Sequence, residues 1–436
     1  MFTTCDAPIK WAHTRTCAPK LLGACLAGLL FVLPISASQA SEDLNLQQAI
    51  QNTLTNNPDL KVFKFRKAAL NGDLQSATLS PGFEVNVSAD NILGSNEYSG
   101  TDQAEWTVSL SSTLELGGQK KARVALANSG LGRLEAQQQV QALATLGDVT
   151  RSYIQVLAAQ ERLALAQSSY ALRQVKSRAK AGAAPKAEVL RAQAATGHAQ
   201  LKQARQQQML DALKVALAAQ WGDTQVNFNQ VNGSLYEFGQ DASFATLLHQ
   251  LKQNPALEVF ASQSRMQAAQ LRLTQAQSRG DIGWSLGVKQ FQQDNSSALV
   301  AGISMPLFSG SRNSGALQSA HAQLNEADAR EDAALLRLRT QLYLAYSNRQ
   351  QAIYTANTLA KEVVPTLTQA LAETRKAYES GRYRYLDYVS AQQHLLSAQG
   401  ALIDAAASAL TFAAEIEQLS AQPLSLKASH FSELKG

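Results

Sequence analysis

Two acidic residues occupy matching positions in two similar segments of the chain. Glu188 lies in AGAAPKAEVLRAQ (181–193), and Asp387 lies in SGRYRYLDYVSAQ (380–392), at a constant offset of 199 residues. Each carboxylate follows a turn and stands in the first turn of a helical pattern, where an acidic side chain offsets the helix dipole by about 0.3–1 kcal/mol. A carboxylate at such a turn can also attract cations, and the sequence leaves both roles open.

No arrangement of reactive side chains predicts catalysis. Cys5, Cys17 and Cys25 all lie in the first 40 residues, so a processed chain would have no thiol for a disulfide, a metal site or a nucleophile. The remaining histidines show no metal-ligand spacing; they are His198, His249, His321, His394 and His430. A net charge of +5 over 436 residues does not predict nucleic-acid binding. We expect no enzyme, no cofactor, no bound metal and no nucleic-acid partner.

The first 40 residues have the pattern of an export signal. Basic residues precede the apolar segment LLGACLAGLLFVLP (21–34), and small residues precede a cleavage site after Ala40. A lipoprotein signal is an alternative, because Leu22 to Cys25 resembles a lipobox, but Cys25 lies inside the apolar segment. We therefore predict a signal peptide over residues 1–40.

The chain beyond the signal contains the same phrase twice. NNPDLKVF begins at position 56 and QNPALEVF begins at position 253. Each copy is followed by a helical stretch and then by two segments in which apolar and polar residues alternate, a pattern of period two that predicts a β-hairpin. The hairpins span 83–116 and 282–308, and their apolar faces carry Trp106 and Trp284.

Long helical patterns follow both hairpins, from about 118 to 180 and from about 310 to 380. Each ends in a turn with a glycine, Gly182 or Gly381, where a residue with positive φ commonly ends a helix. A return helix then runs to about Trp221 or Leu419.

These segments predict a mainly α fold built of two repeats. The predicted divisions are a signal peptide (1–40), a first repeat (41–221), an equatorial linker (222–243), a second repeat (244–421) and a C-terminal tail (422–436).

The hairpins indicate a membrane. Strands of about ten residues that are polar on one face suit a water-filled transmembrane barrel. Four strands cannot close a barrel, and lipid does not tolerate open strand edges, so several chains must contribute strands.

Three motifs now make a family resemblance specific: LELGG (114–118), PLFSGSR (306–312) and GRYRYLDYVSAQ (381–392). Together with the two-fold repeat, they resemble the TolC-type outer membrane efflux proteins over essentially the whole mature chain. LELGG followed by QKKAR, together with EVLRAQ (188–193), is most similar to the heavy-metal cation efflux (CzcC-like) subgroup.

The resemblance implies a homotrimer in the outer membrane that extends into the periplasm. Its twelve strands would form one β-barrel, and its helices would form an α-helical barrel that docks to a periplasmic adaptor (membrane fusion) protein and an inner-membrane RND-type pump. Such a protein is a passive exit duct, here for heavy-metal cations.

The resemblance also implies roles for residues at the tips, which are the turns at Gly182 and Gly381 where the long helices end. Family members often carry a second acid in the second tip, where this chain has Ser390, so Asp387 alone would form the acidic ring, supplemented by Glu188. Tyr378 matches a tyrosine that ties neighbouring tip helices in the closed state, and Arg382 and Arg384 bracket the position of a linking arginine. A solvated basic turn is the alternative role of these arginines. Gly182 and Gly381 could form the surface gripped by the adaptor.

Two other functions stay open on the sequence alone. The same channel fold could serve drug efflux or type I protein secretion. A periplasmic coiled-coil adaptor would also be exported and helical, but it should contain one helical hairpin and compact barrel domains, whereas this chain has two helical hairpins and two strand pairs.

Overall fold

The structure is a computed structural model that describes residues 43–167, 186–240, 242–307 and 309–422. The predicted signal peptide, the first tip with Gly182, and the tail beyond Gln422 lie outside the described residues, so these predictions stay untested.

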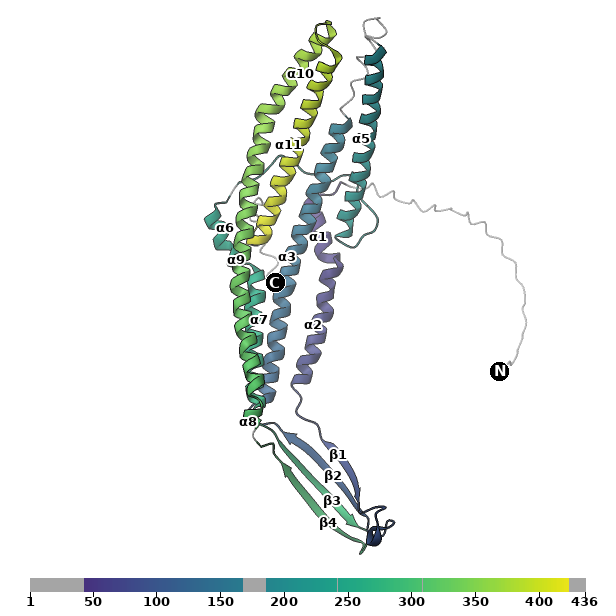
Figure 1. Ribbon diagram of the computed structural model, residues 1–436, viewed down its shortest axis with the longest axis vertical. Helices are drawn as coiled ribbons and strands as arrows, with labels where there is room; N and C mark the ends of the chain where they lie inside the picture. The colour runs from purple at the N-terminus through teal and green to yellow at the C-terminus, as the bar shows by residue number, and fades with distance from the viewer. Residues whose placement is uncertain (1–42, 168–185, 241, 308, 423–436) are drawn as a thin grey trace, which may run out of the picture. The chain divides into compact units, whose positions relative to one another are not determined.

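Each repeat consists of two helices, a hairpin and two long helical segments, arranged in the same order (Figure 1). In the first repeat these elements are α1 (Leu46–Asn56), α2 (Pro58–Ala77), β1 (Glu84–Asp90), β2 (Glu105–Leu114), α3 (Gln119–Gln167) and α5 (Lys186–Ala219). In the second they are α6 (Phe244–Leu251), α7 (Pro255–Gln277), β3 (Ile282–Phe291), β4 (Ser296–Ser304), α8 (Ser309–Arg312), α9 (Ser314–Thr358), α10 (Val364–Glu379) and α11 (Tyr385–Ser420).

The long helices lie side by side in one layer of four columns (Figure 1). On the side of the sheet, the described contacts run in the order α2, α3, α7 and α9. On the side of the tips, they run in the order α5, α3, α11 and then α9 or α10. The columns formed by α2 with α5 and by α9 with α10 are therefore the two lateral edges of the layer.

The two hairpins form one antiparallel sheet in the order β1-β2-β3-β4. The register places the predicted apolar side chains on a common face, so Val85, Leu110, Leu286 and Ala301 lie directly opposite one another across the four strands. This face is exposed, with 69% of Val85 and 54% of Leu286 accessible. The alternation read from the sequence is confirmed.

The opposite face of the sheet is polar. It carries Asn86, Ser109 and Ser285, and Lys289 bridges Glu105 across the β2–β3 pair with an Nζ to Oε2 distance of 2.7 Å. Within the described residues, the outer edges of β1 and β4 have no paired strand. Both features are those expected of a segment of a water-filled barrel.

The repeated Asn-Pro phrase joins helices end to end. Asn57 accepts hydrogen bonds from the first turn of α2, while its Nδ2 donates to the Gln220 carbonyl just beyond α5, at 2.7 Å. Asn254 caps α7 in the same way and donates to the Gln418 and Leu419 carbonyls in the last turn of α11, at 3.1 and 2.8 Å. Each asparagine thus satisfies donors at one helix start and carbonyls at another helix end.

The second long helix is not continuous, contrary to the prediction of one helix from about 310 to 380. A π-helical turn, Leu359–Val363, separates α9 from α10, and Pro365 lies in the first turn of α10. Proline has no N–H to donate into the preceding turn and its ring crowds that turn, so the ladder of hydrogen bonds changes register there.

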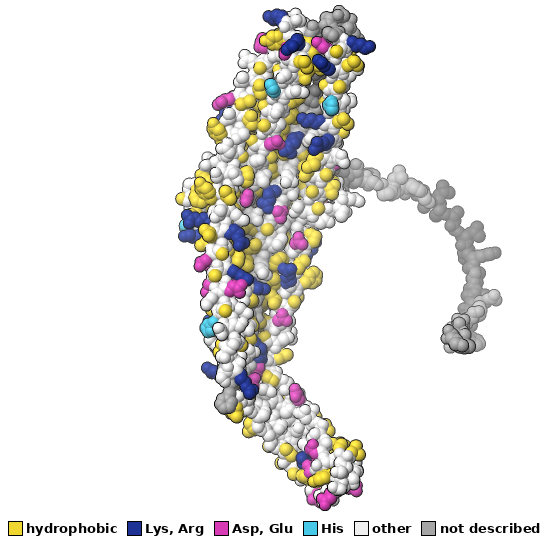
Figure 2. All heavy atoms as spheres, in the orientation of Figure 1, with side chains coloured by type: hydrophobic (Ala, Val, Ile, Leu, Met, Phe, Trp, Pro, Cys, Tyr) yellow, Lys and Arg dark blue, Asp and Glu magenta, His cyan; other side chains and the backbone are white. Residues whose placement is uncertain are grey.

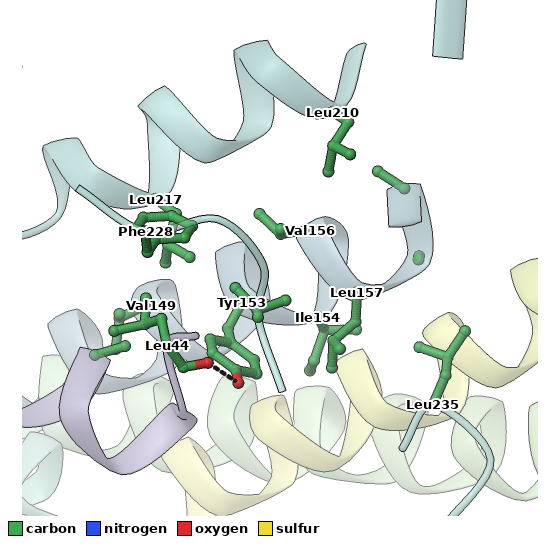
Figure 3. Close-up of a cluster of buried hydrophobic side chains, with 14 of the residues drawn as sticks. Leu44, Val149, Tyr153, Ile154, Val156, Leu157, Leu210, Leu217, Phe228 and Leu235 are labelled. Carbon is green, nitrogen blue, oxygen red and sulfur yellow. Dashed lines mark hydrogen bonds between the residues drawn. The ribbon is translucent and has the colours of Figure 1, made fainter. Parts of the chain in front are cut away.

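The main core lies where the linker and the N-terminal segment cross α3 and α5 (Figure 3). Leu44 forms an isolated parallel bridge with Val231 of the linker. The Tyr153 hydroxyl on α3 donates to the Leu44 carbonyl at 2.8 Å and lies against the Asn232 carbonyl. One tyrosine therefore fixes the linker and the N-terminal segment to the same helix.

Within the described residues, α11 is the helix long and apolar enough to span a membrane by length and composition, with a mean hydropathy of 1.3 over its best window. Its buried residues include Ile403, Ala409 and Ile416, and it packs against α3 and α9.

Candidate gate at the tip of the second repeat

The turn that ends α10 is closed by Gly381. Its φ of +77° is strained for residues with a side chain and free for glycine. The Arg382 N–H donates to the Ala377 carbonyl at 2.8 Å, and the Gly381 N–H donates to the Tyr378 carbonyl at 3.0 Å. This pair of bonds is a Schellman motif, and the turn requires the conformation expected of Gly381 from the sequence.

Asp387 caps the helix that follows the turn. Its Oδ2 accepts a hydrogen bond from the Arg384 backbone N–H at 3.0 Å and lies 3.5 Å from the Arg384 Nε. The carboxylate is in the third position of α11, where it also meets the positive end of the helix dipole. About 40% of the side chain is still accessible, so the capping role leaves part of the carboxylate exposed.

Three tyrosines form a buried cluster beneath the turn. Tyr378 is 1% exposed and its ring stacks on Tyr388, with ring centroids 5.6 Å apart and planes 8° from parallel. Tyr385 lies against Tyr378 at 6.2 Å. Ala192, from α5 of the first repeat, completes the cluster.

The cluster brings Glu188 of the first repeat to the second tip. The Tyr378 hydroxyl lies 3.4 Å from Glu188 Oε2, so the acidic residue of the first repeat lies against the tyrosine cluster of the second repeat. Burial, followed by the neighbouring Tyr378, Tyr388 and Glu188, raises the pKa of Tyr385. In the described residues the buried Tyr385 hydroxyl has no hydrogen-bond partner.

The arginines of the turn are exposed. Arg382 donates from Nε to Ser380 Oγ at 3.1 Å, and Arg384 is 81% exposed beside Asp387. Figure 2 shows basic and acidic side chains gathered at the tip end of the helices. Among the described residues, no group of three or more His, Cys, Asp or Glu side chains could hold a metal ion.

Tyr385 and Tyr388 were not among the residues predicted for this site. Both stand in YRYLDY (383–388), next to residues that were singled out, but their contact with Tyr378 crosses a turn. The signal in the sequence would have been tyrosines on both sides of the turn. Tyr378 stands three residues before Gly381, and Tyr385 and Tyr388 stand four and seven residues after it.

Both repeats match the family model described as "outer membrane efflux protein", over residues 49–223 and 247–422. The chain is 25% identical over 377 residues to the cobalt-zinc-cadmium resistance protein CzcC of Cupriavidus metallidurans, covering 84% of this chain and 88% of that protein.

Solved structures show the same fold. The outer membrane protein VceC of Vibrio cholerae has a TM-score of 0.71 at 21% identity, covering 87% of this chain and 96% of that chain. The open state of the Neisseria gonorrhoeae outer membrane channel MtrE has a TM-score of 0.70 at 17% identity, covering 88% and 90%. The chain therefore belongs to the outer membrane efflux protein family and is an outer membrane efflux channel that extends into the periplasm.

Proposed function

We propose that three copies of this chain form the exit duct of a tripartite efflux system. The observation that carries this proposal is the four-stranded sheet, which is apolar and exposed on one face, polar on the other and unpaired at both edges. Three such sheets joined edge to edge would give twelve strands, and closure would remove every open edge from the lipid. The helical layer would then surround the periplasmic part of the duct.

The substrates of the duct are heavy-metal cations, and the duct conducts them passively. The similarity to CzcC supports this class of substrate. The duct itself needs no bound metal. Selection of the substrate and the energy for its transport would come from an inner-membrane RND-type pump. A periplasmic adaptor would join that pump to the tips, at the turns of Gly182 and Gly381.

The tip of the second repeat is the gate of this duct. Three copies of Asp387 around one axis would place three partly exposed carboxylates at the narrow end, and such a ring favours cations. Tyr378 and Glu188 would hold α10 and α11 against α5 in the closed state, through the cluster that includes Ala192. Arg382 and Arg384 would then supply the basic rim of the turn.

The test is conductance of the purified mature protein in planar lipid bilayers. We expect a small cation-selective current in the wild type that divalent or trivalent cations block. Asp387→Asn keeps an oxygen for the Arg384 N–H but removes the charge, so we expect about a tenfold weaker block, because three charges are lost from one ring.

Glu373→Gln is the matched control, because Glu373 is an exposed tip carboxylate paired with Lys376 at 2.8 Å. It should leave the block unchanged. An unchanged block in Asp387→Asn would remove the acidic ring from the proposal, and the absence of any channel would overturn the duct itself.

A further inference from the structure

In the half of the layer next to the sheet, α2 packs against α3 and α9 packs against α7, and within the described residues no further long helix covers their outer sides. On α2, Phe63 is buried on the side of α3, whereas Lys61 and Phe65, four residues apart on the opposite face, are exposed. Phe65 is 72% exposed. Val62, three residues before Phe65 on the same helix, is also exposed, so this side of α2 carries neighbouring uncovered apolar side chains of the kind found where another protein packs.

The other edge presents a stripe of α9. Ala327 and Ala334 are buried on the inner side, while Asp332 and Leu336, four residues apart, are exposed, and Leu336 is 67% accessible. The stripe continues toward the tips with Tyr343, whose ring lies 5.5 Å from Phe244 of α6, and with the exposed Tyr354. Small residues lie between these side chains, so the stripe could accept an aromatic ring.

A row of polar contacts sets the relative heights of the two edges. Lys67 Nζ lies 3.4 Å from Glu135 on α3, Arg133 Nη1 lies 2.6 Å from Gln263 on α7, and Ser264 Oγ lies 2.6 Å from Asp328 on α9. Because these residues are adjacent on α3 and on α7, the row crosses all four helices at one level. It places Lys67 of α2 level with Asp328 of α9.

Two opposite charges, one on each edge, lie at nearly the same height, on the tip side of that row. Lys61 is six residues from Lys67 and Asp332 is four residues from Asp328, both in the direction of the tips. At about 1.5 Å per residue, the two side chains differ in height by only about 3 Å. Neither Lys61 nor Asp332 has an ion pair within the described part of the chain.

From this complementarity we infer that α2 of one copy packs lengthwise against α9 of the next, with Lys61 paired to Asp332 and Phe65 seated on the α9 stripe. The inference rests on the proposed ring of copies and names the seam that holds it together. The unpaired strand edges agree, because β1 follows α2 and β4 precedes α9 (Figure 1). One head-to-tail contact repeated around an axis would pair both the helical and the strand edges.

Cysteine crosslinking of the full chain tests the seam, since the sequence after residue 40 contains no cysteine. Lys61→Cys combined with Asp332→Cys should give dimers and trimers on denaturing gels after oxidation or a short bismaleimide, and reduction should reverse the disulfide products. Each single variant should stay monomeric, because the contact joins two different surfaces. Lys61→Cys with Tyr354→Cys is the control, since that pair lies about 30 Å apart in height.

A charge exchange gives a second readout. Lys61→Glu and Asp332→Lys should each lower the fraction of assembled protein about two- to fivefold, as expected for an exposed ion pair, and the combined variant should restore it. Absence of crosslinking in a protein that conducts would overturn the seam but not the duct. Crosslinked trimers that never conduct would uphold the seam and overturn the duct.

Discussion

At the scale of single residues, Tyr153 shows what burial does to a titrating group. Its hydroxyl is enclosed where the linker crosses α3, and burial raises its pKa to about 12, against a partly opposing hydrogen bond with Asn232 (Figure 3). The folded protein therefore holds the neutral phenol more firmly than the unfolded chain does. This difference links the stability of the helical layer to alkaline pH.

The sign follows from the raised pKa. Below pH 10 the tyrosine is neutral in both the folded and the unfolded states, so its contribution is fully present. Between about pH 10 and 12 the unfolded chain releases the proton first, and up to about 3 kcal/mol of stability is lost. We expect the melting temperature of the wild type, followed by helical circular dichroism, to fall more steeply in this range than that of Tyr153→Phe.

Tyr153→Phe should begin from a lower stability at neutral pH, by about 1–3 kcal/mol, because the buried hydroxyl and its hydrogen bond are lost, although the Leu44 carbonyl keeps the bond from the Asn232 N–H at 2.9 Å. Equal slopes for the two proteins above pH 10 would show that Tyr153 does not carry the alkaline transition. Other tyrosines with raised pKa values, such as Tyr388, are present in both proteins and cancel in the comparison.

At the scale of elements, the asparagine of each Asn-Pro phrase links the start of one helix to the end of another. We expect Asn254→Ala to lower the free energy of unfolding by about 2–4 kcal/mol, because it removes a helix cap and leaves two buried carbonyls without a donor. Asn57→Ala should cost less, because Asn57 donates to a single carbonyl. Thermal unfolding in detergent measures both.

Two variants separate the contribution of the helix cap from that of the link between α7 and α11. Asn254→Ser keeps an oxygen that can accept from the Ala256 N–H and removes the amide donor without adding a charge, so its loss of stability is the cost of losing the link to the end of α11. Asn45→Ala removes the exposed cap of α1, which makes its hydrogen bonds within its own first turn, and should cost about 1 kcal/mol. If Asn254→Ala lowers the free energy of unfolding no more than Asn45→Ala does, the link between α7 and α11 does not stabilise the protein.

At the scale of the whole molecule, the two faces of the sheet should respond oppositely to a charge. Leu286 and Ser285 are neighbours in the middle of β3, on the apolar and the polar face respectively. We expect Leu286→Arg to destabilise the membrane-inserted protein by about 2–4 kcal/mol, because it places a cation in lipid. Ser285→Arg, facing the polar side, should assemble normally and change only the conductance.

The measurement is the assembled fraction in outer membrane preparations, by heat modifiability on gels. Similar losses for both variants would mean that the sheet does not present one face to lipid. Trp106 lies near the loop end of the apolar face and Trp284, in edge contact with Phe83, near the helix end, as expected for the aromatic girdles of such a face.

The candidate site was predictable only in part, because its contacts cross chain reversals. Asp387 and Gly381 were predicted from the turn and the repeat, whereas Tyr378 was predicted from the family resemblance. The stacking of Tyr388 on Tyr378 depends on how closely α10 and α11 approach, and the contact with Glu188 depends on α5 lying beside them. Neither distance is encoded in local spacing.

The sequence by itself determined the repeat, the hairpins and their apolar faces, because alternation and helical periodicity are local consequences of backbone geometry. It did not reveal the break before Pro365, since a pattern rich in alanine and leucine outweighs one residue unless the hydrogen bonds are followed. Only the tertiary structure decided which helices are neighbours, why the Asn-Pro phrase occurs twice, and that Lys61 and Asp332 stand level on opposite edges. These depend on contacts between residues more than sixty positions apart, which packing of the whole layer sets.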